Sequence, residues 1–284
     1  MINYKLTIFT PCYNGAKTIK RVFDSVESQT YSNFEWIIVN DGSTDQSDIV
    51  IRNLIEKSKI KDKIKYFTQR NMGKHRTWNN TVDLSTGEYF IPADADDSFI
   101  PNTLEYFNNR LNEIATTYGN LEKFSGVNVC VYNPINNKII GSPYPSNGLV
   151  SDNVELAYKY KIQGEHWGCI RTDLLRQEKF PEVNGHFYTE SRLWSKLAKL
   201  GYKVVCYNDS LRAYYYEATS LTHNRKHTWD FSTNMMHLRF NCWAIVNLGW
   251  RIFRYSPVAY LKLMKQVVVK TAKCALAPII TRID

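Results

Sequence analysis

The sequence predicts an α/β protein with a mostly parallel sheet flanked by helices, followed by a basic helical extension. Strand-like and helix-like segments alternate over the first 130 residues, which is the order of folds whose parallel sheet has helices on both faces. Hydrophobic residues make up 44% of the 284 residues and charged residues 22%, so the chain can bury a large core. Lys and Arg gather near the end of the chain.

The strands predicted in the first half are short apolar runs that end at turn residues. They cover residues 6–10, 36–39, 64–67, 88–91 and 127–132. The helices between them have apolar residues three and four positions apart, which places those side chains on one face. The first of these helices contains Ile19, Val22, Phe23 and Val26. Further helices are expected at residues 50–55, over about 74–84, and after Pro101 through residue 114.

The second half predicts mixed structure and then helices. Residues 133–150 are rich in Asn, Pro, Gly and Ser, which is typical of a surface loop or a joint between subdomains. Beyond this loop we expect a helix near 189–200, strands at 204–207 and 211–216, and helical structure from about residue 224. These patterns divide the chain into three parts, which are residues 1–132, 133–223 and 224–284.

The net charge of +9 is unevenly distributed. Residues 240–284 hold seven Lys and Arg against one acid, whereas the first 239 residues contribute only +3. The main body is therefore not a broad nucleic-acid-binding surface, and no nucleic-acid partner is expected. The basic end suits an anionic partner, for which a membrane surface is expected and a nucleic acid is the weaker alternative.

One helix near the basic end has an amphipathic pattern. On a helical wheel four lysines share an arc of about 140°, and they are Lys262, Lys265, Lys270 and Lys273. The other side contains Tyr260, Met264, Val267 and Ala275. Such a helix is typical of binding to an anionic membrane surface. The alternative is a helix that packs on the main body and leaves its lysines in solvent.

The sequence also indicates where the protein resides. Residues 1–5 run directly into a predicted strand, and no uncharged apolar stretch reaches ~18 residues. The six cysteines are widely spaced without a CxxC pair, which disfavours a zinc knuckle and fits buried thiols in a reducing compartment. We therefore expect a cytoplasmic protein whose basic helix binds the inner face of the cell membrane.

An acidic cluster follows the predicted strand at 88–91. Asp94, Asp96 and Asp97 are three carboxylates within four residues, and crowding them is costly unless a cation is present. Hard oxygen ligands at a strand end suit Mg²⁺ or Mn²⁺ together with a substrate phosphate. The alternative is a solvated acidic turn, but a strand end is the ligand-binding edge of such sheets.

Three other polar turns follow predicted strands, and each by itself would be an ordinary turn or helix cap. They are residues 10–15, residues 40–45 and residues 71–76. The last contains Lys74, His75 and Arg76 beside a glycine and a helix start, which suits a phosphate. Neither a Walker loop nor a GxGxxG motif is present, which argues against P-loop and dinucleotide-binding enzymes.

Taken together and in this order, the motifs resemble those of glycosyltransferase family 2, whose members have the GT-A fold. The resemblance covers about residues 5–216. Its motifs here are Pro11–Asn14, Asp41–Ser43, Asn71–Gly73, and Gly87–Tyr89 leading to Asp94–Asp97.

This resemblance implies a role for each motif. Pro11 and Tyr13 would line the nucleotide base pocket, and Asp41 would hydrogen-bond the base. Asp94 would lie beside the ribose and donor sugar. The rest of the nucleotide and donor site would comprise Asn14, Asn71, Gly73, Lys74 and Ala95.

The resemblance also implies a metal site and a catalytic base. Asp96 would ligate Mn²⁺ or Mg²⁺ on the diphosphate, with support from Asp97. The family usually places its general base in a Glu-Asp pair at a helix start. That pair is missing here, and Glu190 is the acid at the corresponding place. Glu190 would then be the base, unless it only complements the helix dipole.

Residues of the acceptor site are less sharply indicated. His166 and Trp167 could line the acceptor cleft, with the Trp ring stacked on a sugar. The alternative is a packed aromatic ring and a hydrogen-bonded histidine in the core.

The sequence thus predicts an inverting, metal-dependent glycosyltransferase. It would transfer one sugar from a nucleoside diphosphate donor, a UDP sugar, to a hydroxyl of a glycan or lipid-linked saccharide. The setting implied is bacterial surface polysaccharide synthesis. Two alternatives are a catalytically silent nucleotide-sugar-binding protein of the same fold and a phosphohydrolase using Asp94 and Asp96.

Overall fold

The computed structural model describes residues 1–181, 190–215 and 231–280. Its centre is one ten-stranded sheet. Eight of the strands have the order β3-β2-β1-β4-β9-β6-β10-β5, and the other two, β7 and β8, pair with β6 and β10. The strands are β1 (Leu6–Cys12), β2 (Phe34–Asp41), β3 (Ile64–Gln69), β4 (Tyr89–Pro92), β5 (Ser98–Phe99), β6 (Phe124–Asn133), β7 (Lys138–Ile139), β8 (Leu149–Ser151), β9 (His166–Arg171) and β10 (Lys203–Ala213).

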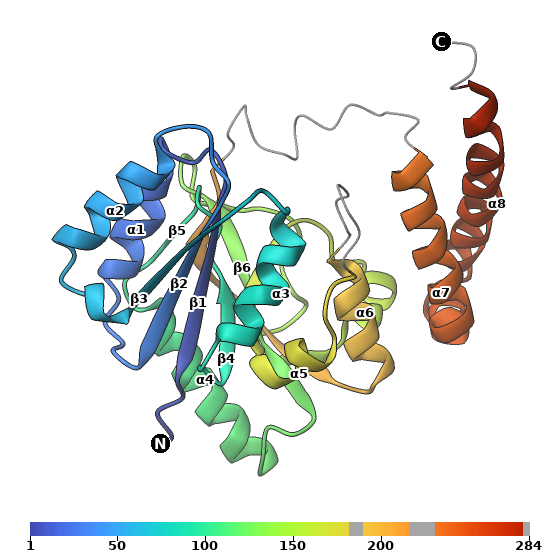
Figure 1. Cartoon of the computed structure of the whole chain (residues 1–284). Helices are drawn as coiled ribbons and strands as arrows, with labels where there is room; N and C mark the ends of the chain where they lie inside the picture. The colour runs from blue at the N-terminus through green and yellow to red at the C-terminus, as the bar shows by residue number, and fades with distance from the viewer. Residues whose placement is uncertain (182–189, 216–230, 281–284) are drawn as a thin grey trace.

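Helices lie on both faces of this sheet (Figure 1). They are α1 (Ile19–Glu27), α2 (Ser47–Lys57), α3 (Lys74–Leu84), α4 (Thr103–Tyr118), α5 (Thr172–Gln177), α6 (Ser191–Lys199), α7 (Phe231–Tyr255) and α8 (Pro257–Ile280), with short turns η1 (Lys61–Lys63) and η2 (Glu155–Lys159). The predicted α/β class is therefore confirmed, and so is the helical structure expected near the C-terminus over residues 231–280; residues 224–230 and 281–284 lie outside the described part of the chain.

Alternation along the strands builds a separate core on each face. Ile8 of β1 packs with α1, α2 and α4 in one cluster, whereas the next residue, Phe9, packs with α3, α5 and α6 in another. Successive strand residues point to opposite faces, so a strand buried on both sides becomes a continuous apolar run. This is why β1 and β2 could be recognised in the sequence.

Strands β3, β2, β1 and β4 run parallel, and parallel strands place their carboxyl ends at the same edge. β9 lies between β4 and β6 and is antiparallel to both. The sequence analysis did not predict β9, because His166 and Trp167 were considered only as cleft-lining or core side chains and not as parts of a strand. The two strands expected at 204–207 and 211–216 are one strand, β10, with register shifts between Tyr207 and Arg212.

The C-terminal helices α7 and α8 form a hairpin that lies beyond α6 from the sheet (Figure 1). Leu248 and Ile252 of α7 pack with Leu263 of α8, and the cluster includes Val154 and Ala198 of the main body. Arg251 anchors the hairpin, because its guanidinium lies 2.6 Å from the buried Asp152 carboxylate. Within residues 1–181, 190–215 and 231–280, no helix is long and apolar enough to cross a membrane.

The structure corrects one part of the amphipathic interpretation of α8. Lys270 was expected on the solvated basic face. Its ammonium instead donates a 2.8 Å hydrogen bond to Asn234 of α7, because α8 turns this side toward its neighbour.

Candidate active site

The predicted motifs come together at the carboxyl ends of β1, β2 and β4. Pro11 lies at the end of β1, Asp41 ends β2, and residues 94–97 follow β4. Tyr13 is exposed just beyond β1, so its ring is available to a ligand. Ala95 is half-buried and packs against the main core.

Asn14 joins the first two motifs. Its backbone adopts a positive φ of 52°, which asparagine tolerates better than most residues. Its side-chain oxygen accepts hydrogen bonds from the backbone N–H of Thr44 at 2.8 Å and of Asp45 at 3.3 Å. The Asn14 backbone N–H donates to Ser43 Oγ at 3.0 Å. Asn14 therefore fixes the shape of the edge between β1 and β2.

Asp41 joins the second motif to the third in the same way. One of its carboxylate oxygens accepts from the Met72 N–H at 2.9 Å, and the other from the Gly73 N–H at 2.8 Å. Gln69 adds a third donor at 2.7 Å. The side chain is buried. In this structure Asp41 organises the loop that leads into α3, and its expected contact with a nucleotide base stays a prediction.

Gly42 is required by the close approach of these two loops. Its φ is +73°, and a Cβ at this position would lie 2.5 Å from the backbone nitrogen of Asn71. We expect Gly42→Ala to lower the free energy of unfolding by about 3 kcal/mol, because strain and a backbone clash add. The measurement is urea denaturation followed by circular dichroism.

Gly119 offers a matched control for this change. It also has a positive φ, +80°, but a Cβ there would meet nothing within 4 Å. Gly119→Ala should therefore cost only about 1 kcal/mol. If both variants lost the same free energy of unfolding, the close approach of the Asn71 backbone would not be what restricts position 42 to glycine.

A network of charged side chains lies at this edge of the sheet. Lys74, the first residue of α3, places its ammonium 2.9 Å from an Asp94 oxygen and 3.5 Å from a Glu190 oxygen. Glu190 directly precedes α6 and is 38% exposed. The structure thus brings the predicted base to the predicted donor site, across more than ninety residues of sequence.

Arg212 of β10 forms the second part of this network. Its guanidinium lies 2.5 Å from an Asp97 oxygen and 3.6 Å from an Asp94 oxygen. Both Arg212 and Asp97 are buried. Asp97 is therefore held inside by an ion pair, which supports the loop rather than exposing a carboxylate to solvent.

The three carboxylates have different electrostatic environments. Although burial acts to raise it, Lys74 and Arg212 hold the pKa of Asp94 below its ordinary value. Burial and the Asp94 charge raise the pKa of Asp96. Burial also raises the pKa of Asp97, to about 7, despite Arg212. Among the described residues no Lys or Arg forms an ion pair with the Asp96 side chain.

These environments fit a divalent cation at Asp96. Its carboxylate is crowded by Asp94 and lacks an ion-pair partner in the described part of the chain, so a bound cation would offset an uncompensated negative charge. Within that part, however, no cluster of three or more His, Cys, Asp or Glu side chains is arranged as a complete metal site. A ligand such as the donor diphosphate would have to complete the coordination shell.

Two arginines that the sequence analysis did not single out support the acidic loop. Arg21 of α1 donates a 2.7 Å hydrogen bond to the backbone carbonyl of Asp96, and Arg212 binds Asp97 from β10. The sequence could have indicated that Arg212 has an acidic partner, because it is a charged residue within an apolar strand, and buried charges are paired. Arg21 gave no such signal, since it lies on a helix beside ordinary surface residues.

Other predicted residues take different places. His75 was considered as a cation for phosphate, but it is buried with its ring 4.7 Å from Phe180. Burial lowers the pKa of His75 to about 4, so the ring is neutral at neutral pH. Asn71 is exposed, and Gly73 precedes α3 with a φ of 84°.

Trp167 belongs to the core. It is 4% exposed, stacks on Phe99 with ring centroids 4.8 Å apart, and donates from Nε1 to the Pro92 carbonyl. A ring covered in this way cannot stack on a sugar, which corrects the acceptor-binding expectation for Trp167. His166 is half-buried with Nε2 2.9 Å from the Ser142 carbonyl oxygen, and its role in acceptor binding stays a prediction.

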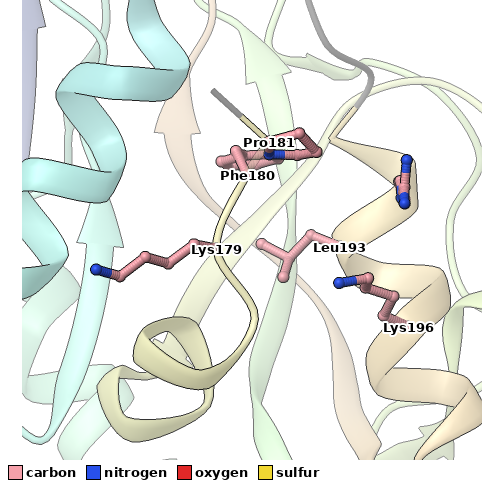
Figure 2. A pocket seen from close by; sticks show the side chains of 6 residues that line it. Lys179, Phe180, Pro181, Leu193 and Lys196 are labelled. Atoms are coloured by element: carbon pink, nitrogen blue, oxygen red, sulfur yellow. The ribbon is translucent and has the colours of Figure 1, made fainter. Parts of the chain in front are cut away.

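A small pocket lies beside this site, between residues 179–181 and α6 (Figure 2). Phe180, Pro181 and Leu193 form its apolar part. Lys179 points away toward α3, where it pairs with Asp83, and Lys196 pairs with Glu178. Both lysines are therefore engaged in ion pairs, and Arg192 is a third cation in the lining.

The sequence is similar to a known protein family and to several of its members. The family model described as glycosyl transferase family 2 matches residues 7–153. A GalNAc(5)-diNAcBac-PP-undecaprenol β-1,3-glucosyltransferase of Campylobacter jejuni is 28% identical over 203 residues, which are 69% of this chain and 60% of that relative. The glycosyltransferase GlyA of Streptococcus pneumoniae is 28% identical over 91% of this chain, which spans 37% of GlyA.

Solved structures share the architecture. Residues 1–349 of Staphylococcus aureus TarS in complex with UDP-GlcNAc match with a TM-score of 0.64 and 15% identity, over 95% of this chain and 72% of that one. A mannosyltransferase of Pyrobaculum calidifontis in complex with GDP-Man and Mn²⁺ matches with a TM-score of 0.58 and 19% identity, over 97% of this chain and 76% of that one. At these identities the likeness establishes the fold.

Proposed function

Because the chain belongs to glycosyl transferase family 2, we propose that it transfers one sugar from a nucleoside diphosphate sugar to a hydroxyl of a glycan or lipid-linked saccharide in bacterial surface polysaccharide synthesis. The observation that carries this proposal is the position of Lys74. Its ammonium lies between the Asp94 carboxylate of the donor motif and the Glu190 carboxylate before α6. One cation thus connects the place expected for the donor with the place expected for the base.

In the proposed reaction each of these residues has a distinct task. Asp96 would hold Mn²⁺ or Mg²⁺ together with the donor diphosphate, and the ion would stabilise negative charge on that diphosphate. Lys74 neutralises Asp94 and adds positive charge near the phosphates. Glu190 accepts the proton of the acceptor hydroxyl, whose oxygen attacks the anomeric carbon from the side opposite the diphosphate. Attack from that side inverts the configuration.

The donor we propose is a UDP sugar. The support is that S. aureus TarS, which shares the fold, binds UDP-GlcNAc in its solved complex. The C. jejuni relative is named for an acceptor saccharide linked to undecaprenol diphosphate, which supports a lipid-linked acceptor for this chain. His166 is proposed as part of the acceptor site.

The test is release of nucleoside diphosphate from a panel of UDP and GDP sugars, with Mn²⁺ or with EDTA. We expect one UDP sugar to be hydrolysed slowly without acceptor and only with metal. Metal-dependent binding of a UDP sugar without any turnover, even with lipid-linked acceptors, would indicate the silent binding protein. Release of phosphate from simple phosphate esters would indicate the phosphohydrolase.

The geometry of the acidic loop argues against the phosphohydrolase. Asp94 contacts both Lys74 and Arg212, so attack by its carboxylate would have to break two ion pairs. Asp97 is buried in its ion pair with Arg212. Of the three carboxylates only Asp96 is left for a metal, whereas a phosphohydrolase of the type considered needs both Asp94 and Asp96.

A further inference from the structure

The outer side of α7 exposes apolar side chains in a continuous stripe. Val246 is 82% exposed and Trp250 75%, and Phe253 is also exposed. These residues follow one another at spacings of four and three, so they share one face of the helix. The opposite face, with Leu248 and Ile252, is buried against α8 and the main body. The helix is therefore apolar on two sides.

Helix α8 repeats this arrangement. Leu263 and Cys274 are buried toward α7, whereas Leu261, Met264 and Val268 are exposed on the other side. The sequence pattern had placed Met264 on the same side as Tyr260. The structure separates them, because Tyr260 packs against Phe253 and Gly249 of α7 while Met264 faces solvent. A helix that only packed on the main body would need one apolar side, not two.

The turn of the hairpin concentrates the exposed apolar residues. Trp250 and Phe253 are stacked with ring centroids 6.1 Å apart, and Val258 and Leu261 at the start of α8 are each 63% exposed. Large exposed patches of this kind mark interaction sites. Aromatic rings are favoured where one side of a surface is apolar and the other wet.

The charge of the hairpin narrows the choice of partner. Residues 231–280 contain seven Lys and Arg and no Asp or Glu. Arg251 and Lys270 are used inside the structure, whereas Arg239, Arg254, Lys262 and Lys265 are exposed. A second copy of the same face would bring two acid-free basic surfaces together, which is unfavourable. An anionic lipid surface instead supplies both the apolar interior and the negative charge.

We propose that the outer face of the α7–α8 hairpin lies on an anionic bilayer, with Trp250, Phe253, Val258, Leu261 and Val268 entering the acyl region and the exposed cations at the headgroups. We call these five residues the apolar face. This proposal extends the proposed function, because it says which surface of the protein would contact the membrane. The observations that support it lie in the hairpin and not in the donor site. Membrane binding therefore requires neither nucleotide nor turnover.

The experiment is sedimentation of the full chain with phosphatidylcholine vesicles that contain 0 or about 30% phosphatidylglycerol, in low and in high salt. We expect binding that requires the anionic lipid and weakens in high salt. Trp250→Ser combined with Leu261→Ser should weaken binding by about tenfold or more, because two apolar side chains no longer enter the bilayer. Lys262→Glu combined with Lys265→Glu should weaken it to a similar extent.

Matched controls come from α2 and the loop after it, away from the hairpin. Ile49→Ser removes an apolar side chain that is 62% exposed, and Lys57→Glu with Lys59→Glu makes the same change in net charge at two exposed lysines. Both should bind vesicles like the wild type, and circular dichroism checks that every variant is folded. Unchanged binding by the hairpin variants would overturn the proposal. So would a stable dimer in sedimentation velocity that the Trp250 and Leu261 changes dissociate.

The two proposals fail separately. If no nucleotide sugar is turned over but vesicle binding depends on the apolar face, the membrane inference stands and the proposed function fails. If turnover is observed and vesicles are not bound, the reverse holds.

Discussion

Glu190→Gln is expected to lower the rate of sugar transfer by about 10²- to 10⁴-fold while donor binding stays within about twofold. The amide keeps the size of the side chain and its place before α6 but cannot accept a proton. The Glu190 carboxylate lies 3.5 Å from the Lys74 ammonium, which in turn contacts Asp94. The proposed base is therefore adjacent to the proposed donor motif, where an acceptor hydroxyl would have to approach the anomeric carbon. The measurement is steady-state transfer to acceptor, with donor affinity determined by calorimetry.

The alternative for Glu190 is a purely electrostatic role at the start of α6. Glu178→Gln is the matched control, because the Glu178 carboxylate pairs with Lys196, which lies on α6. If Glu190 only complements the helix dipole, its replacement costs about 0.3–1 kcal/mol of stability and little activity. Similar, small effects of both changes on transfer would therefore contradict the assignment of Glu190 as the base.

Asp96→Asn is expected to have an effect of similar size through a different cause. Removing the carboxylate should lower metal-dependent turnover by about 10³-fold, since metal stabilisation of a departing diphosphate is worth several kcal/mol. Binding of Mn²⁺ in the presence of UDP, measured by calorimetry, should weaken in parallel. Asp83→Asn on α3 is the control, because Asp83 belongs to a surface ion pair with Lys179.

The stability of the Asp96 variant provides an independent readout. Burial and the charge of Asp94 raise the pKa of Asp96 in the folded chain above its unfolded value. The folded state then loses stability as the pH rises from the unfolded pKa through the folded pKa, because it must release a proton that it holds more tightly. Asp96→Asn should remove that loss. In EDTA at neutral pH the variant should melt at a higher temperature than the wild type.

Metal should reverse this order of stability. In the wild type, added Mn²⁺ with UDP should raise the melting temperature because it binds only the folded state, whereas the variant should respond weakly. If Asp96→Asn were less stable than the wild type in EDTA and still gained stability from Mn²⁺, we would conclude that the metal binds at another site.

The sequence by itself determined the parallel half of the sheet and the edge at which the motif residues gather. β1 and β2 are buried on both faces, so their apolar runs are a local property that periodicity can detect. The turns that follow them are local as well. The resemblance to the family singled out Glu190, whereas its contact with Lys74 could not be derived from the sequence.

Only the tertiary structure decided which polar residues are engaged in contacts within the fold. Asp41 and Asn14 bind neighbouring loops, Trp167 is covered by Phe99, and Arg212 reaches Asp97 from a strand more than a hundred residues away. The second apolar face of α8 became evident only when α7 covered the first. The physical reason is the same in each case. A residue's type and spacing set what it can bind, but its burial and partners depend on segments that are distant in sequence and adjacent in the fold.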